Sequence, residues 1–163
     1  MGPREISAVK KLLLIALVLV GTVMSATGAT LPNQTFSVNL TLTSKCEVVT
    51  VPSDIALTYT SFQITASSNT SSYVFRCTNT LPISSIALDA VAGGGLGGAT
   101  IVDTATNLNY TVSLTGVPAA GNGANQIVTI TASILANQAG TCANATCTNA
   151  ASANKTRTIT FTY

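Results

Sequence analysis

The feature that most constrains the fold is a stretch of strict alternation at residues 35–43, TFSVNLTLT. Apolar side chains at Phe36, Val38, Leu40 and Leu42 are separated by single polar residues, which is the period of a β-strand that buries one face. At about 3.3 Å per residue, residues 36–42 would span about 23 Å, which is the length of an average strand or slightly more. Such a strand could pair within its own domain, or it could be lent to another molecule.

Short β-rich runs punctuated by turn residues follow along the rest of the chain. The pattern predicts strands at residues 47–51, 55–60, 72–78, 84–91, 100–103, 108–115, 126–135 and 157–163. It predicts turns at residues 52–54, 67–70, 93–98 and 121–123, where Pro, Gly, Ser, Asn and Asp gather. With the opening run there are about nine short strands and no helix, so we expect an all-β sandwich of two antiparallel sheets.

Residues 1–29 have the composition of a secretory signal peptide, with a basic start, an apolar core and small residues at the end. We expect cleavage after Ala29, with Ala26 as the alternative. A membrane-spanning helix is the rival interpretation, but the apolar run to Met24 is about 13 residues and a bilayer requires about 20. The expected organisation is a signal peptide at 1–29, an N-terminal extension at 30–45 and one sandwich domain at 46–163.

The charge of the exported chain is balanced. Removing residues 1–29 takes three of the seven basic residues and one of the five acidic residues, which leaves four of each. A protein that binds nucleic acid or an anionic membrane needs a basic patch, and the remaining chain lacks the charges to build one. We therefore expect no nucleic-acid partner.

An even number of cysteines in an exported chain predicts two disulfides. The cysteines are Cys46, Cys77, Cys142 and Cys147. Three pairings are possible, and we favour Cys46 with Cys77 and Cys142 with Cys147, because the second pair lies in a short polar loop whose ends can meet easily. A zinc site with four cysteine ligands is the rival interpretation, but the chain has no C-x-x-C spacing and no histidine.

Catalytic chemistry is hard to find in this sequence, and we expect no enzyme, no cofactor and no metal. The absence of histidine excludes Ser-His and Cys-His mechanisms. A glycosidase pair among the acidic residues is conceivable, but no spacing singles out two of them, and we interpret them as solvated carboxylates. They are Glu47, Asp54, Asp89 and Asp103. The glycine-rich segment 93–98 lacks the Lys-Ser/Thr and the helix of a phosphate-binding loop, so a flexible turn is expected.

Four features together resemble the spore coat protein U family, which includes the pilins of archaic, Csu-type chaperone-usher pili. They are the alternating run that ends at Cys46, the segment 73–77 (YVFRC), the segment 134–138 (ILANQ) and the terminal segment 158–163 (TITFTY). The resemblance covers most of the chain after residue 29. It implies an immunoglobulin-like sandwich that lacks its final strand, with a groove filled first by a periplasmic chaperone and then by the N-terminal strand of the next subunit.

The resemblance also implies partners and site residues. The donor strand would insert Phe36, Val38, Leu40 and Leu42 into a neighbouring copy or a related pilin. The chaperone would contact the terminal strand, at Ile159, Phe161 and Tyr163, and an outer-membrane usher would assemble the subunits. The implied product is a structural subunit of a pilus or surface coat that passes through the periplasm to the cell surface.

The chain departs from the family pattern in two places. The loop from Cys142 to Cys147 and the residues up to Asn154 form an insertion before the last strand, and the donor-like run contains no glycine. Two rival functions stay open at the level of sequence. One is a self-contained secreted β-sandwich that serves as a surface or carbohydrate-binding module, and the other is a secreted hydrolase.

Overall fold

The computed structural model describes residue 28 and residues 30–163, so the expected signal peptide lies almost wholly outside the described residues. The chain divides into a unit that ends at Leu40 and a body, Thr41–Tyr163. The described residues include no helix that is long and apolar enough to span a membrane.

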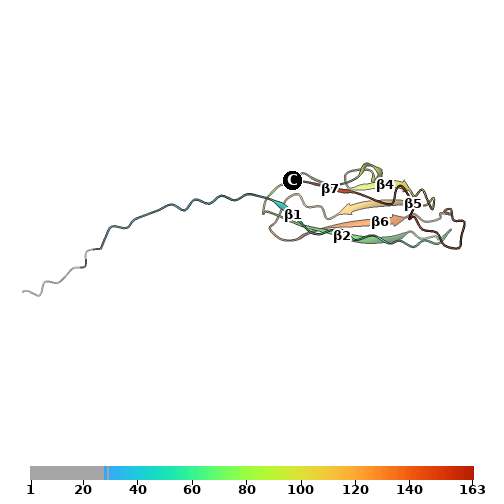
Figure 1. Cartoon of the computed structure of the whole chain (residues 1–163), viewed down its shortest axis with the longest axis horizontal. Coiled ribbons are helices and arrows are strands. Elements are labelled where there is room, and N and C mark those ends of the chain that lie inside the picture. The colour runs from blue at the N-terminus through green and yellow to red at the C-terminus, as the bar shows by residue number, and fades with distance from the viewer. Residues whose placement is uncertain (1–27, 29) are drawn as a thin grey trace, which may run out of the picture. The chain divides into compact units, whose positions relative to one another are not determined.

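Five strands of the body form one antiparallel sheet in the order β1-β2-β6-β5-β4 (Figure 1). The strands are β1 (Cys46–Thr50), β2 (Ser67–Cys77), β6 (Gln126–Ile134), β5 (Asn109–Thr115) and β4 (Gly97–Val102). The longest pairing joins β2 to β6, from Ser67 opposite Ile134 to Phe75 opposite Gln126. This central pair sets the length of the body.

A second antiparallel sheet contains only two strands, β3 (Ser85–Leu88) and β7 (Ile159–Thr162). It faces the larger sheet across an apolar core, in which the ring of Phe161 on β7 lies 4.7 Å from the ring of Phe75 on β2, centroid to centroid. A short 3₁₀ helix, η1 (Ala90–Ala92), follows β3. The all-β class and the two antiparallel sheets predicted from the sequence are therefore confirmed.

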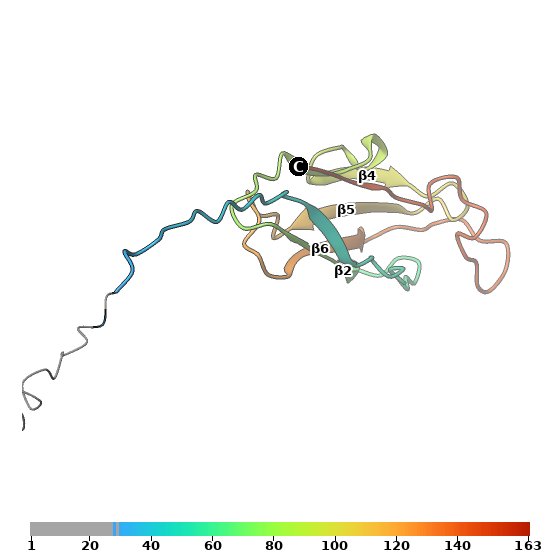
Figure 2. The same ribbon diagram turned by 60° about the vertical axis from the view of Figure 1, so that its left-hand side comes forward.

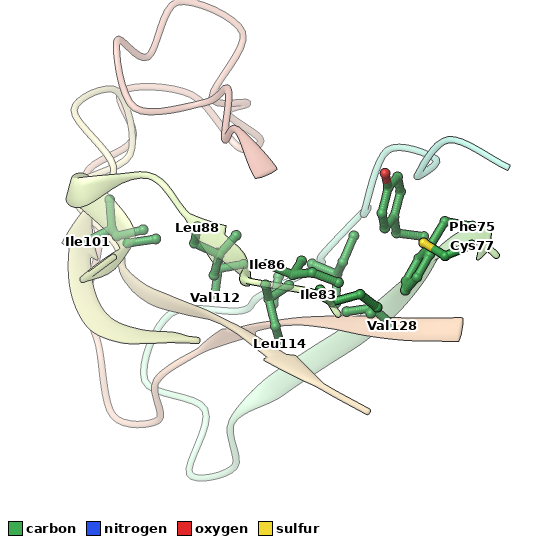
Figure 3. Close-up of a cluster of buried hydrophobic side chains, with 13 residues drawn as sticks. Phe75, Cys77, Ile83, Ile86, Leu88, Ile101, Val112, Leu114 and Val128 are labelled. Carbon is green, nitrogen blue, oxygen red and sulfur yellow. The ribbon is translucent and has the colours of Figure 1, made fainter. Parts of the chain in front are cut away.

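The core is built by alternation along each strand (Figure 3). In β6 every second side chain is buried, because successive side chains of a strand point to opposite faces. The buried members of β6 are Val128, Ile130, Ala132 and Ile134, and the outward members are Ile127, Thr129, Thr131 and Ser133. The buried apolar residues of β2 are Tyr73, Phe75 and Cys77.

The two ends of the body differ in what they carry (Figure 2). At one end, the terminal end, β1 begins opposite the last residue of β2, Cys46 against Cys77, and the chain finishes at Tyr163 (Figure 1). At the other end, the loop end, β2 begins opposite the last residue of β6. The loop end carries residues 60–66, 103–108 and 135–156.

Several boundaries differ from those predicted. The turn predicted at residues 67–70 is wrong, because these residues pair in register with β6, from Ser67 opposite Ile134 to Thr70 opposite Thr131. Cross-strand packing outweighs the turn preference of Ser and Asn there. The strand predicted at 84–91 ends at Leu88, where η1 takes over. The remaining strands of the large sheet overlap their predicted ranges.

The glycine-rich segment is only partly the flexible turn that was predicted. Gly93 ends η1 with a φ of 97°, but Gly97 already belongs to β4. A Cβ at Gly97 would lie 2.3 Å from the carbonyl oxygen of Val112, and its φ is 87°. Glycine is therefore required at this position by both close approach and backbone conformation.

Both predicted disulfides, Cys46–Cys77 and Cys142–Cys147, are present in the structure. The first joins residues that are direct partners in the β1–β2 ladder, and Cys77 is buried in the core. The second closes a loop whose residues are exposed. Two bridges are what an oxidising compartment permits.

The two bridges should differ in what they contribute to stability. In the chain-entropy treatment, a bridge that spans 31 residues stabilises by about 3.7 kcal/mol and one that spans 5 residues by about 2 kcal/mol. We expect the double variant Cys46→Ser/Cys77→Ser to lose more unfolding free energy in urea than Cys142→Ser/Cys147→Ser. Equal losses of unfolding free energy would contradict this dependence on the length of the closed loop.

Candidate assembly surface

The terminal strand β7 is hydrogen-bonded along one edge only. The carbonyl of Thr158, just before β7, accepts a hydrogen bond from Asp89 N on the β3 side at 3.0 Å. Backbone groups of successive residues point to opposite edges of a strand, so those of Ile159 and Phe161 face away from β3. Among the described residues, no strand pairs with this second edge. The edge therefore presents the unpaired donors and acceptors to which another strand can be added.

The side chains of β7 close the core while its edge stays open. Ile159 and Phe161 are half-buried and pack against the core, and the Phe161 ring also lies 6.4 Å from the ring of Tyr73. Tyr163 is 56% exposed, with its ring 5.8 Å from that of Phe161. The three residues predicted to contact a chaperone thus lie together, two facing the core and one facing solvent.

A second segment of the body, residues 53–60, runs without joining either sheet. Its side chains alternate, with Ile55, Leu57 and Tyr59 half-buried and the residues between them exposed. Ile55 and Leu57 pack against the core. The prediction for residues 55–60 is therefore confirmed for the alternation of side chains. It is wrong for the strand itself, because these residues pair with neither sheet.

Side chains hold this segment over the inner face of β2. The amide of Asn69 donates to the carbonyl of Ala56 at 3.0 Å, and the hydroxyls of Ser53 and Ser71 are 3.1 Å apart. Ser71 lies on the same face of β2 as Phe75. The layer opposite the large sheet thus consists of β3, β7 and residues 53–60, and no backbone hydrogen bond joins β7 to that segment within the described residues.

The alternating N-terminal run lies outside both sheets. Residues 30–45 contain no strand, so this run is not paired within the chain's own domain, which was one of the two alternatives that the sequence left open. Its large apolar side chains are strongly exposed, from 71% at Val38 to 91% at Leu40. Phe36 and Leu42 fall between these values. Four apolar side chains at strand spacing are therefore left without a place in the core.

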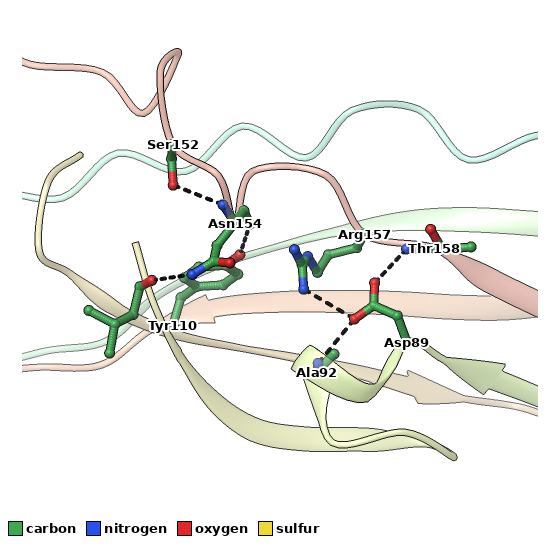
Figure 4. Close-up of polar contacts among 8 residues, drawn as sticks. Asp89, Ala92, Tyr110, Ser152, Asn154, Arg157 and Thr158 are labelled. Carbon is green, nitrogen blue, oxygen red and sulfur yellow. Dashed lines mark hydrogen bonds and ion pairs between the residues drawn. The ribbon is translucent and has the colours of Figure 1, made fainter. Parts of the chain in front are cut away.

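Asp89 anchors the start of β7 (Figure 4). Its carboxylate accepts hydrogen bonds from Thr158 N at 2.8 Å and Ala92 N at 3.1 Å, and it pairs with the Arg157 guanidinium at 3.1 Å. Burial alone would raise the pKa of Asp89, but these two hydrogen bonds and the Arg157 charge together hold the pKa below its usual value. One carboxylate thereby ties the terminal strand to the cap of η1.

Asp103 is a second carboxylate with a structural role that the sequence did not reveal. It is buried and accepts hydrogen bonds from Ala105 N at 3.1 Å and from Thr106 N at 2.7 Å, which closes the turn between β4 and β5. Burial raises the pKa of Asp103. Hydrogen bonds from the hydroxyls of Ser152 and Thr106 and from the two N–H groups lower the pKa by more, so that it lies below its usual value. The prediction of solvated carboxylates is wrong for Asp103, and only partly right for Asp89, whose side chain is 25% exposed and bound on several sides.

The inserted loop is folded back onto this turn. Thr104 N and Oγ1 contact the Ser152 hydroxyl at 3.2 and 3.1 Å. Asn154 N donates to the same hydroxyl at 3.3 Å (Figure 4), and the side-chain amide of Asn154 donates to the Val102 carbonyl at 2.8 Å. The Tyr110 hydroxyl donates to the Asn154 carbonyl. The base of the loop is therefore fixed, while the part closed by Cys142–Cys147 is exposed to solvent.

Within the described residues, the side chains that could bind a metal ion do not gather at one site. No group of three or more His, Cys, Asp or Glu side chains there could hold a metal ion. A shallow pocket at the terminal end has its charges paired internally, because Glu47 binds both Lys45, at 2.8 Å, and Arg76. The pocket is lined by Lys45, Glu47, Arg76, Cys77, Thr78 and Gly123.

Comparison of the chain with protein-family models, with curated proteins and with solved structures found no match. The resemblance to the spore coat protein U family therefore stays a prediction from sequence motifs.

Asp89 should make the body sensitive to acid. Its folded-state pKa is below the unfolded value, so its stabilisation is complete above the unfolded pKa and is lost as pH falls through the folded pKa. We expect Asp89→Asn to lower the urea midpoint at pH 7 and to flatten its decline below about pH 4. The control is Asp54→Asn, at an exposed carboxyl outside these contacts. An unchanged acid profile in Asp89→Asn would contradict this role.

Proposed function

We propose that this chain is a structural subunit of an extracellular fibre, assembled when the N-terminal run of one copy completes the fold of the next. The observation that carries the proposal is the pairing of β7 on one edge only, together with four exposed apolar side chains at strand spacing. One chain thus holds both an open edge and an unpaired strand-like segment. Adding an extended segment to an exposed sheet edge is an established mode of recognition.

The donor strand would lie between β7 and residues 53–60. Its backbone would pair with the open edge of β7, and Phe36, Val38, Leu40 and Leu42 would point into the core beside Phe161. An interface of this kind joins different surfaces of two copies and extends head to tail instead of closing. The completed domain would be an immunoglobulin-like sandwich.

The energetics favour such an exchange. Burying four side chains at about 1.5 to 3 kcal/mol each gives about 6 to 12 kcal/mol before ordering costs are subtracted. Each added backbone hydrogen bond contributes about 1 kcal/mol. These gains oppose the costs of association and of ordering the extension.

The proposed route is export, capture by a periplasmic chaperone and delivery to an outer-membrane usher. Two disulfides support an oxidising compartment. The chaperone would hold β7 through Ile159, Phe161 and Tyr163 until the next copy supplies its extension. No catalytic role is proposed, and no cofactor is required.

The alternative function is a self-contained secreted sandwich, a surface or carbohydrate-binding module that does not polymerise. It would be favoured by a stable monomer that needs no chaperone. The exposed run 35–43 and the open edge of β7 would then have no role, and for that reason we prefer the fibre subunit.

A single charge on the inserted face should stop assembly. We expect Val38→Asp and Leu40→Asp, and deletion of residues 30–43, to leave the subunit bound to its chaperone and to abolish surface fibres, because an unpaired buried carboxylate is strongly disfavoured. The measurement is chaperone pull-down together with fibre yield. Asn39→Asp is the matched control, since it places the same charge on the opposite face of the run and should assemble. Loss of the folded subunit in Val38→Asp, Leu40→Asp and the deletion would refute the donor role.

The terminal strand should be needed for capture. Removing Thr160–Tyr163 should abolish chaperone binding and lead to periplasmic degradation. That truncation also takes Phe161 from the core, so Tyr163→Asp is the sharper variant, because Tyr163 is mostly exposed. We expect Tyr163→Asp to weaken chaperone capture in pull-down while the melting temperature of the body stays within a few degrees of wild type. Normal capture of both variants would exclude the clamp role of this strand.

A further inference from the structure

Two large apolar side chains are exposed at the loop end of the body. Phe62 is 73% exposed and Ile64 is 82% exposed. They lie two residues apart on the segment between residues 53–60 and β2, and neither belongs to the core. Single exposed apolar residues are common, but two on one short segment call for a physical reason.

The segment that carries them is held rigidly. Phe62 N donates to the Gln138 carbonyl at 2.7 Å, Asn137 N donates to the Gln63 carbonyl at 2.8 Å, and the Ser61 hydroxyl donates to the Ala139 carbonyl at 2.6 Å. The Gln138 side chain in turn donates to the carbonyl of Asn109 at 2.8 Å. Phe62 and Ile64 are therefore presented from a fixed platform.

The backbone at Phe62 adopts a conformation that is unfavourable for an aromatic residue. Its φ is 65°, in the left-handed region that glycine and asparagine tolerate and that bulky residues rarely adopt. The Phe62 ring is exposed to solvent and makes no contact with the core, so it does not offset the strain of its own backbone. Strain of this kind points to a role outside the chain's own fold.

In the proposed fibre, the next copy lies beside the loop end, where Phe62 and Ile64 are exposed. β7 runs from the loop end to the terminal end, and every ladder in the body is antiparallel. An extension from another copy that pairs antiparallel with β7 runs toward the loop end of the accepting copy. The last residues of that extension then lie at this loop end. Only residues 43–45 separate Leu42 from Cys46, so the two Cα atoms are at most about 14 Å apart. The body of the donating copy must then sit against the loop end of the accepting copy.

We propose that Phe62 and Ile64 form the contact between successive bodies, by docking on the terminal end of the next copy of this chain. The inference rests on the proposed function. It adds a second interface to the donor strand, one made by the folded bodies themselves. The contact limits the freedom of the short connection at residues 43–45 and stiffens the fibre.

The terminal end offers a surface of matching chemistry. Its two loops, residues 78–84 and 116–125, contain no charged residue, and neither does the segment 60–66. The loops are joined by hydrogen bonds from Thr80 N to the Gly121 carbonyl and from Gly121 N to the Leu81 carbonyl, both at 2.8 Å. Leu81 and Val117 there are half-buried. The charged side chains beside these loops, Lys45, Glu47 and Arg76, are paired with one another. The two uncharged loops can therefore cover two apolar side chains without burying an unpaired charge.

Photo-crosslinking within assembled fibres tests this contact. A benzoylphenylalanine introduced at Phe62 should link successive copies, with the crosslinked peptide in residues 78–84 or 116–125. The same probe at Leu96, another exposed apolar residue, should give no such link. Fibres that form without a link from position 62, or with a link to any other surface or to foreign material, overturn the inference. Failure of the wild-type chain to form fibres overturns the proposed function instead, and the inference with it.

The substitution Phe62→Asn separates assembly from folding. Asparagine tolerates a positive φ, so the melting temperature of the subunit should be unchanged or higher. Fibres of this variant should dissociate about tenfold faster or more in denaturant, because the buried ring is lost. A lower melting temperature with an unchanged fibre lifetime would show that Phe62 serves only the fold, and would refute the contact.

Discussion

The contact between Phe161 and Phe75 is the interaction on which the rest of the structure depends. It is the point where the last strand of the chain meets the longest strand of the large sheet, and the Phe161 ring also lies 6.4 Å from that of Tyr73 on the same strand. A two-stranded sheet cannot cover five strands, so this pair closes the core at β7 while the edge beyond it stays unpaired. The anchor at Asp89 and Arg157 then fixes where β7 begins. The body thus combines a closed core with one unpaired strand edge beside it.

The sequence predicted the class of fold and the chemistry of the covalent links. Alternation at Val128, Ile130 and Ala132 is a local property that a strand imposes on its own residues, so β6 could be located without any knowledge of its neighbours. The disulfide pairing could be predicted for a similar reason, because the short loop between Cys142 and Cys147 limits which ends can meet. The apolar alternation of residues 35–43 was also visible from spacing alone, but the exposure of these side chains was not.

Other features depend on which segments lie next to each other in the fold. The alternation of side chains along one segment does not predict its neighbours. Residues 55–60 alternate as a strand does, yet they lack a partner in the described body and stay unpaired. The four-residue run at 67–70 has the composition of a turn, but β6 offers it a ladder and it becomes strand. Asp89 and Asp103 acquire their roles from N–H groups that the fold brings to them. The conformation of Phe62 likewise follows from its contacts with residues 137–139.

The position of the first disulfide determines how the body would carry a mechanical load. Cys46 is the first residue of β1 and is bonded to the last residue of β2, at the place where the N-terminal segment joins the body. A pull on that segment passes through the covalent bridge into β2, which pairs with the central strand β6 from Ser67 to Phe75. Tension therefore bypasses the five-residue edge strand β1, which would otherwise be peeled from the sheet one hydrogen bond at a time. The short β1 ladder is spared, and the force is borne by the β2–β6 pair at the centre of the large sheet.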